Sequence, residues 1–346
     1  MTHELKKILA HYKRASEAGH KTVLASVVSL QGSSYRRPGV RMLIAENGTL
    51  TGAVSGGCVE KEIVRRAAQV FSNGTPLLIT YDGRYRLGCE GTLYILIETF
   101  EPDDECLSAF ESAIKNRKPI TLFSMYGSID NGTYAGNTLF KYSEEKTFTF
   151  SSEAHVQSLQ ETGEMQVFKQ KLKPCFQLVI IGAEHDAVQL CSMASLLGWE
   201  VIVIASASDP RTSINFPGVT TLINSDPQNL DTSIIDNDTA VVLMTHSFAN
   251  DLAYFIAMKN RTPLYLGLLG PAKRREKLWN AYLDRYPETA PEFFNTMYGP
   301  AGLNIGAETP QEIAIAILAE ILAVVRDQKP LSLKDKSGTI HSGTQW

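Results

Sequence analysis

Two cysteines of this chain each stand inside a glycine-rich segment, and about thirty residues separate them. Cys58 belongs to Ser55-Gly-Gly-Cys-Val-Glu60, and Cys89 belongs to Gly88-Cys-Glu-Gly91. Glycine lets backbone N–H groups converge on an anion, and a cysteine thiolate is both a nucleophile and a soft metal ligand. The two segments are therefore candidates for an anion-binding site that has sulfur beside it.

Arginine side chains accompany the glycines. Arg36 and Arg37 stand in a further glycine-rich segment, residues 32–39, and Arg41 follows two residues after its end. The guanidinium group is a planar donor fork that suits phosphate and carboxylate. Arginines at these positions are candidates for holding a phosphate, although they could equally be solvated surface residues.

A helix is expected to begin just after Gly57, which would put Cys58 in its first turn. The helix dipole there favours a thiolate and lowers the pKa of the thiol, but Glu60 and Glu62 in the same turn oppose this effect. Cysteine is also among the most buried residue types, and most glycine-rich loops are only turns. A structural role for both cysteines therefore stays open, and the closeness of the two segments is what supports a binding role.

The second half of the chain contains a strand, a glycine turn and a helix in succession. The stretch from Leu178 to Ala187 has this pattern, and Gly182 can make the tight turn that opens a nucleotide-binding crevice. The second glycine of the dinucleotide fingerprint is replaced by Glu184. A side chain where a pyrophosphate would press on bare backbone argues against ordinary NAD binding. The helix N-terminus behind the turn still predicts an anion site.

Three polar residues follow the ends of strands in this half. Asp209 comes a few residues after the second strand, near where an acid would bind ribose hydroxyls. His185 and His246 each follow a strand on the side where α/β crevices open. Histidines of this kind are more often structural than metal-binding, so we predict no metal site. The chain has no Ser-His-Asp order, phosphate-binding Walker loop or HExxH motif, and we assign no catalytic residue.

The elements that must position these residues belong to an α/β protein. Residues 1–126 read as an α/β domain, with the hairpin signal Asn47-Gly48. Residues 127–174 read as a variable hairpin and connector, residues 175–326 as a doubly wound parallel-sheet domain, and residues 327–346 as a polar tail. Within the second domain, Thr309-Pro-Gln-Glu312 predicts a capped start for a long helix.

Composition narrows the class of protein. The 346 residues are 44% hydrophobic and 20% charged, and the net charge is −4, so no basic footprint for nucleic acid is present. No apolar run is long enough for a membrane span. The five cysteines are an odd number without CxxC spacing, which indicates neither a disulfide framework nor a zinc site. We expect a cytoplasmic protein.

The motifs, taken in order along the chain, resemble the XdhC/CoxI family of maturation factors for xanthine and carbon monoxide dehydrogenases. The family pattern usually has Gly-Ala-Gly-His where this chain has Glu184 as the third residue. The matching stretches are Gly32-Ser-Ser-Tyr-Arg-Arg-Pro-Gly-Val-Arg-Met-Leu43, Gly52-Ala-Val-Ser-Gly-Gly-Cys-Val-Glu60, Gly88-Cys-Glu-Gly91, Ile181-Gly-Ala-Glu-His185, Asp209-Pro-Arg211, Met244-Thr-His246, Tyr265-Leu-Gly-Leu-Leu-Gly270 and Gly302-Leu-Asn-Ile-Gly-Ala-Glu-Thr-Pro310.

The resemblance implies an N-terminal XdhC/CoxI domain and a C-terminal Rossmann-like domain. It implies that the chain binds molybdenum cofactor, protects it from oxidation, and delivers it to a molybdenum hydroxylase. A cysteine desulfurase is a further partner compatible with this role, as is a second copy of the chain. Under this reading the cofactor-binding residues are Cys58, Cys89, Gly56, Gly57, Arg36, Arg37, Arg41, Gly182, His185, Asp209 and His246.

Two other functions stay open at this point. One is an NAD(P)-dependent oxidoreductase, in which His185 or His246 would serve as proton donor. The other is a scaffold without a small-molecule ligand that bridges a sulfurtransferase and an apoenzyme. The resemblance favours a cofactor chaperone over a turnover enzyme. It does not distinguish plain molybdopterin from a dinucleotide form of the cofactor.

Overall fold

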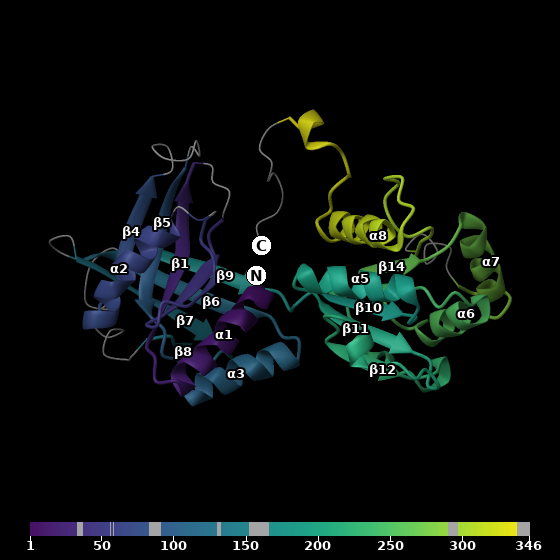
Figure 1. Cartoon of the computed structure of the whole chain (residues 1–346), viewed down its shortest axis with the longest axis horizontal. Helices are drawn as coiled ribbons and strands as arrows, with labels where there is room; N and C mark the ends of the chain where they lie inside the picture. Colours follow the sequence, from purple (N-terminus) through teal and green to yellow (C-terminus); the bar gives the residue numbers. More distant parts are fainter. Residues whose placement is uncertain are drawn as a thin grey trace. The chain divides into compact units, whose positions relative to one another are not determined.

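The computed structural model describes residues 1–32, 37–55, 57, 59–82, 91–129, 133–151, 166–289 and 297–337. The chain forms two compact units, an N-terminal unit from Met1 to Pro174 and a C-terminal unit that begins at Cys175 (Figure 1). Each unit combines helices with a β-sheet, so the predicted α/β class is confirmed. Among the residues described, no helix combines the length and the apolar composition needed to cross a bilayer.

The first sheet of the N-terminal unit has the strand order β3-β2-β1-β5-β4. All its neighbouring strands are antiparallel. The Asn47-Gly48 signal marks the β2–β3 hairpin as predicted, and Gly48 has the positive φ of 85° that such a turn requires. The strands are β1 (Thr22–Gln31), β2 (Arg41–Ala45), β3 (Leu50–Gly52), β4 (Leu77–Asp82) and β5 (Thr92–Thr99).

Alternating side chains give this sheet two apolar faces. Val23, Ala25 and Val27 of β1 pack against helix α2 (Glu60–Asn73). Leu24 points to the other face, where it joins a cluster with helices α1 (Thr2–Glu17) and α3 (Asp104–Lys115). Figure 1 shows these helices on their respective sides of the unit. The period of two in the sequence thus decides which helix each residue contacts.

A second sheet, with the order β8-β7-β6-β9, completes the N-terminal unit. The stretch predicted as a hairpin and connector contributes β7, β8 and β9 to it. β9 pairs along β6, and its side chains alternate between exposed and buried toward its end. Its exposed face is what makes the stretch look like a polar linker. The strands are β6 (Ile120–Ile129), β7 (Thr133–Lys141), β8 (Thr147–Thr149) and β9 (Gln166–Leu172).

The C-terminal unit has a six-stranded sheet with the order β12-β11-β10-β13-β14-β15, and every neighbouring pair is parallel. The chain builds outward from β10 to β12 and then returns to β13 on the other side of β10. The order therefore reverses between β10 and β13, as in a doubly wound fold. The strands are β10 (Gln177–Ile181), β11 (Glu200–Ala205), β12 (Thr221–Asn224), β13 (Thr239–Leu243), β14 (Tyr265–Leu268) and β15 (Met297–Tyr298).

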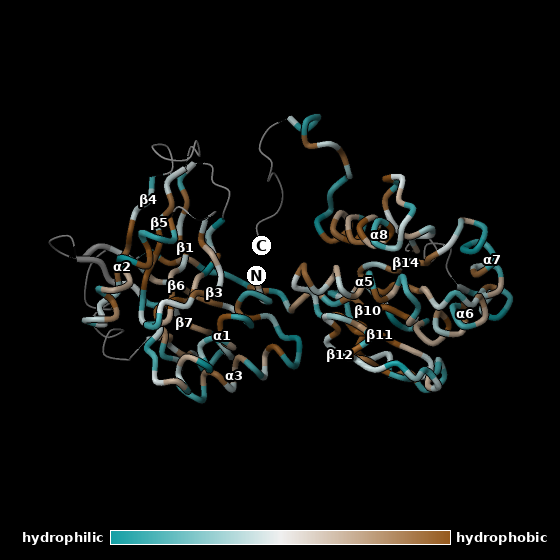
Figure 2. The backbone as a smooth tube through the Cα atoms, viewed as in Figure 1, coloured by the Kyte–Doolittle hydropathy of each residue, from teal (hydrophilic) through white to brown (hydrophobic). Residues whose placement is uncertain are grey.

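Helices cover both faces of this sheet, which leaves its central strands buried and apolar (Figure 2). Helices α5 (His185–Leu196) and α8 (Pro310–Val325) pack on one face, and α6 (Phe248–Ala257) and α7 (Ala272–Leu283) pack on the other. The predicted capping box at the start of α8 is present, between Thr309 and Glu312. Helix α7 was not predicted, because only Leu278 and Tyr282 of it are buried.

A buried carboxyl group joins the two sheets of the N-terminal unit. Glu98 of β5 is fully buried and accepts hydrogen bonds from the backbone N–H of Thr138 at 2.8 Å and from its hydroxyl at 2.5 Å. Burial raises the pKa of Glu98 to about 7, although the bonds from Thr138 and the charge of Arg41 oppose the shift. Ionising this group at neutral pH therefore works against the folded state.

We expect the N-terminal unit to lose stability as pH rises between 4.5 and about 7. The folded unit holds the proton of Glu98 over this range and the unfolded chain does not, so the loss should be on the order of 3 kcal/mol. Chemical denaturation at several pH values measures it. Glu98→Gln should flatten this dependence, whereas Glu105→Gln, an exposed control on α3, should leave it as in the wild type. An unchanged slope in Glu98→Gln would contradict the prediction.

Candidate functional site

The strands of the first sheet bring the glycine-rich segments to one edge. β1 ends at Gln31, which lies opposite Thr92, the first residue of β5. β4 ends at Asp82, which also lies opposite Thr92. The segment after β1, residues 32–39, and the segment before β5, residues 83–91, therefore leave the sheet at the same edge.

The segment that contains Cys58 starts at this edge as well. β3 ends at Gly52, which lies opposite Met42 near the start of β2. Gly52 has a φ of 85°, and a Cβ there would stand 2.3 Å from the carbonyl oxygen of Arg41, so only glycine fits this close approach. Antiparallel pairing thus directs the strand ends that flank all three glycine-rich segments toward the same edge of the sheet. Cys58, Cys89, Gly56 and Arg36 themselves lie outside the described residues.

The start of helix α2 already carries a negative charge. Glu60 accepts hydrogen bonds from the backbone N–H of Ser55 at 2.7 Å and from its hydroxyl at 2.6 Å. Partial burial raises the pKa of Glu60, but these bonds outweigh it and the net pKa is lowered. Beside this loop, Gly57 has a φ of 121° and open space where a Cβ would be. Helix α2 begins at Glu60, so the prediction that Cys58 stands in its first turn is wrong. The N–H of Gly57 donates to the hydroxyl of Ser55 at 3.2 Å.

The two described arginines of the glycine-rich region have different surroundings. Arg37 is half-buried near the segment's end. Arg41, expected to hold phosphate at the surface, is 6% exposed, and its guanidinium donates to the carbonyl of Gly39 at 3.0 Å and to the side chain of Gln170. Its Nε and Nη2 have no hydrogen-bond partner in the part of the chain that is described. Contact with a ligand at the surface would require Arg41 to leave this position.

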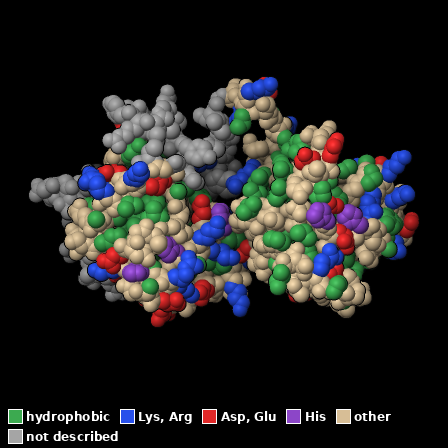
Figure 3. Space-filling model, viewed as in Figure 1, with side chains coloured by type: hydrophobic (Ala, Val, Ile, Leu, Met, Phe, Trp, Pro, Cys, Tyr) green, Lys and Arg blue, Asp and Glu red, His purple; other side chains and the backbone are tan. Residues whose placement is uncertain are grey.

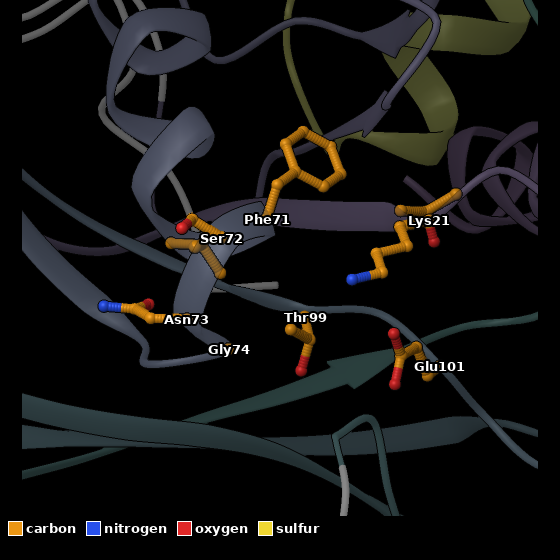
Figure 4. A pocket seen from close by; sticks show the side chains of 9 residues that line it. Lys21, Phe71, Ser72, Asn73, Gly74, Thr99 and Glu101 are labelled. Atoms are coloured by element: carbon orange, nitrogen blue, oxygen red, sulfur yellow. The ribbon is translucent and has the colours of Figure 1, made fainter.

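A small cavity of about 210 Å³ lies at the opposite edge of the same sheet (Figure 4). Lys21, at the start of β1, and Glu101, just after β5, point into it from one side, and Asn73 of α2 lies on the other. Because β1 and β5 run antiparallel, this edge is the one farthest from the glycine-rich segments. The cavity therefore does not belong to the candidate site.

In the C-terminal unit, the candidate residues follow the carboxyl ends of the parallel strands. Gly182 comes directly after β10 with a φ of 134°, and its N–H donates to the carbonyl of Ile204 in β11 at 2.9 Å. A Cβ at Gly182 would lie 2.3 Å from the carbonyl oxygen of Met244, just after β13. The glycine lets three strand ends pack closely where the strand order reverses, which is where doubly wound proteins bind ligands.

Arg211 joins two of these strand ends. It donates from Nε and Nη2 to the two carboxylate oxygens of Asp209, at 2.9 and 2.6 Å. It also donates to the carbonyl of Ala183 and, from Nη2, to Glu184 at 3.1 Å. The hydrogen bonds from Arg211 lower the pKa of Asp209. Asp209, predicted to contact a ligand, thus contacts Arg211 in the structure.

The two histidines of the candidate site lie on exposed turns at this edge. His185 is the first residue of α5 and is exposed. His246 follows β13, and its Nε2 lies 3.3 Å from a carboxylate oxygen of Asp186. Figure 3 shows histidine side chains close together on the visible face of this unit. The structure therefore joins the turn after β13 to the first turn of α5.

The backbone of His246 is held in the left-handed region, with a φ of 58°. Such a conformation in a residue other than glycine persists only when its neighbours fix it. The preceding Thr245 donates its N–H and its hydroxyl to Asp251, at 3.1 and 2.6 Å. Arg274 of α7 in turn donates to the other oxygen of Asp251 at 2.5 Å. Buried Asp251, paired with partly exposed Arg274, holds the turn that presents His246.

Asp251 and Arg274 were not predicted from the sequence. Asp251 is fully buried and lies among apolar residues of α6, so an acid in an apolar helix pattern was the available signal. Nothing local marked Arg274, because its partner is 23 residues away. The described residues include no group of three or more His, Cys, Asp or Glu side chains arranged to hold a metal ion.

Two family models match the chain. The model described as the XdhC Rossmann domain matches residues 178–321, within the C-terminal unit. The model described as the XdhC and CoxI family matches residues 15–82, within the N-terminal unit. The second match includes the segments with Arg37, Arg41 and Gly57, and the first includes the carboxyl edge of the parallel sheet.

Similar proteins match over most of their length. The chain is 32% identical to a probable subunit of xanthine dehydrogenase from Bacillus subtilis, over 88% of this chain and 94% of that protein. It is 24% identical to the molybdenum cofactor insertion chaperone PaoD of Escherichia coli, over 94% and 90%. A crystal structure described as a xanthine dehydrogenase from Bacillus halodurans superposes with a TM-score of 0.74 at 25% identity, covering 95% of this chain and 98% of that one.

Replacing Gly182 with alanine should destabilise the C-terminal unit by on the order of 3 kcal/mol, because the new Cβ would overlap the Met244 carbonyl and the positive φ would be strained. Gly306→Ala is the matched control. Gly306 also has a positive φ, but a Cβ there would meet nothing within 4 Å, so only the backbone cost of about 1 kcal/mol applies. Urea denaturation compares the two variants, and equal losses would refute the overlap argument.

Proposed function

Because the chain belongs to the XdhC and CoxI family, we propose that it is a maturation factor for a xanthine or carbon monoxide dehydrogenase-type molybdenum hydroxylase. In this role it would bind molybdenum cofactor, protect it from oxidation and deliver it to the apoenzyme. The names of the relatives from B. subtilis and E. coli support the proposal. The structural observation that supports it is that the strands flanking the three glycine-rich segments run to the same edge of the first sheet.

The cysteines that the structure describes narrow the choice of sulfur ligands. Cys106, Cys175 and Cys191 are all buried. Burial raises the pKa of Cys106 to about 12 and that of Cys191 to about 11, so neither forms a thiolate readily at neutral pH. We therefore propose that Cys58 and Cys89, which belong to two of the three glycine-rich segments, are the thiols that contact the cofactor.

The neighbouring groups fit an anionic ligand. The backbone at Gly57 has open space beside it, although its N–H donates to the hydroxyl of Ser55 at 3.2 Å, and Arg37 lies near the end of another glycine-rich segment. Backbone N–H groups and a guanidinium are the usual partners of phosphate. We propose that Arg36 and Arg37, together with the backbone at Gly56 and Gly57, hold the phosphate of the pterin. When bound, the cofactor supplies an oxidation-sensitive molybdenum dithiolene, and the role of the chain is to hold and shield it.

We further propose that the carboxyl edge of the C-terminal unit binds a ligand through His185 and His246. Both side chains are exposed beside Gly182, and the backbone of His246 is fixed by the Asp251 contacts. An exposed histidine can donate a hydrogen bond to an anionic ligand. A cysteine desulfurase and the molybdenum hydroxylase client are the proposed protein partners.

Cys58→Ala and Cys89→Ala should each lower the amount of pterin that copurifies with the protein by about tenfold or more, since each removes a proposed ligand. The measurement is fluorescence and mass analysis of small molecules released from protein purified without oxygen from molybdate-fed cells. Cys106→Ala removes a buried thiol and should retain the wild-type amount. Undiminished pterin in both ligand variants would reject the cysteine role.

The same measurement separates the alternatives. A scaffold without a ligand would yield no pterin even from the wild-type protein. An NAD(P)-dependent oxidoreductase would instead yield a nicotinamide dinucleotide. Recovery of a molybdopterin from the wild-type protein is the outcome that the proposed function requires.

A further inference from the structure

A nucleoside diphosphate needs two features at the carboxyl edge of a doubly wound sheet. Its diphosphate needs bare backbone N–H groups at the turn after the first strand, and its ribose needs a free acid after the second strand. In the C-terminal unit, one arginine contacts both the turn after the first strand and the acid after the second strand. We call Arg211, with its partners Asp209 and Glu184, the Arg211 bridge.

The acid after the second strand is already paired with Arg211 through both of its oxygens. Asp209 accepts from the backbone N–H and Nε of Arg211 with one carboxylate oxygen, both at 2.9 Å, and from Nη2 with the other. Its side chain is only 12% exposed. Both oxygens thus face a permanent positive charge, so a neutral ribose diol would have to displace an ion pair.

The turn after the first strand carries a carboxylate where a diphosphate would lie. Glu184 is the residue before α5, its side chain is 59% exposed, and it pairs with Arg211. Arg211 also reaches across to the Ala183 carbonyl, so the bridge lies over the turn itself. Asp186 adds a second acidic group in the first turn of α5. A diphosphate approaching this helix N-terminus would therefore meet negative charge.

We propose that the Arg211 bridge closes the C-terminal unit to nucleoside diphosphates and so determines which ligands this domain accepts. The excluded class comprises nicotinamide and flavin dinucleotides and also a cytidine-bearing form of a cofactor. If the proposed function holds, the chain takes the plain pterin monophosphate, whose phosphate the N-terminal unit would bind. Arg211 is then a specificity-determining residue that acts by occupying the acid and the turn.

The test is binding of ADP and CDP to the full chain, measured by calorimetry and, for weak binding, by ligand-observed NMR. The wild type should bind both with a Kd above about 1 mM. Glu184→Gly with Arg211→Ala frees Asp209 and restores the bare turn, and this double variant should bind at least about tenfold more tightly. Adding Asp209→Asn should remove much of that gain. Arg285→Ala, which removes an exposed arginine just after α7, should bind no better than the wild type.

The measured affinities for ADP and CDP decide whether the proposal stands. A wild type that binds ADP or CDP with a Kd below about 100 μM overturns the proposal, and so does a cooperatively folded double variant that binds no better than the wild type. If the double variant does not fold, Glu184→Gln decides, because it keeps the side-chain length and removes the charge. That variant should bind ADP several-fold more tightly than the wild type, and equal binding overturns the proposal.

The pterin recovered from purified protein tests the proposed function separately from nucleotide binding. Absence of any pterin in purified protein would reject the maturation role and leave the nucleotide result standing. Recovery of a pterin dinucleotide from the wild-type protein would overturn the inference about the cofactor form while supporting the maturation role. Recovery of plain molybdopterin supports both.

Discussion

The close backbone approach at Gly182 is the constraint on which the carboxyl edge of the C-terminal unit depends. Without a side chain there, the ends of β10 and β13 can meet, and the N–H of Gly182 can also reach β11. The turn that carries His246 and the loop that carries Arg211 are then both within reach of the first turn of α5. The close packing that Gly182 allows thus determines where several polar groups lie.

In the N-terminal unit, the corresponding constraint is strand direction. Antiparallel pairing directs the strand ends that flank the three glycine-rich segments toward one edge of the sheet, although the segments are distant in the sequence. The β2–β3 hairpin and the small cavity beside Lys21 lie at the opposite edge. The hydrogen bonds from Thr138 to Glu98 join the two sheets, and Glu98 lies opposite Leu24, toward the edge away from the glycine-rich segments. The unit therefore separates the junction of its two sheets from its proposed ligand-binding edge.

Local signals in the sequence predicted much of the fold. The Asn47-Gly48 turn and the Thr309 capping box depend on residues that are neighbours in the chain, and both are present. Strand β9 and helix α7 were missed because their exposed faces are rich in lysine, glutamine and arginine, which hides the few buried positions. The family resemblance identified the two domains because it uses the ordered set of motifs and not any single one.

The candidate site was harder to predict, because its contacts join residues that are far apart in the chain. The sequence suggested a surface role for Arg41, whereas the β1–β2 register turns it toward Gln170, which is 129 residues away. The sequence likewise predicted a ligand contact for Asp209. It could not predict the contact with Arg211, because the geometry that lets Arg211 reach both Asp209 and Glu184 exists only in the folded domain. The position of a residue in a motif thus predicted where the residue lies in the fold better than it predicted which side chains the residue contacts.

Gly182 and Glu184 differ in what a substitution at each position would change. The first has no room for any side chain, whereas the second projects into solvent and can vary without disturbing the core. A substitution at Glu184 can therefore change the charge beside the turn while the close packing at Gly182, two residues away, is preserved.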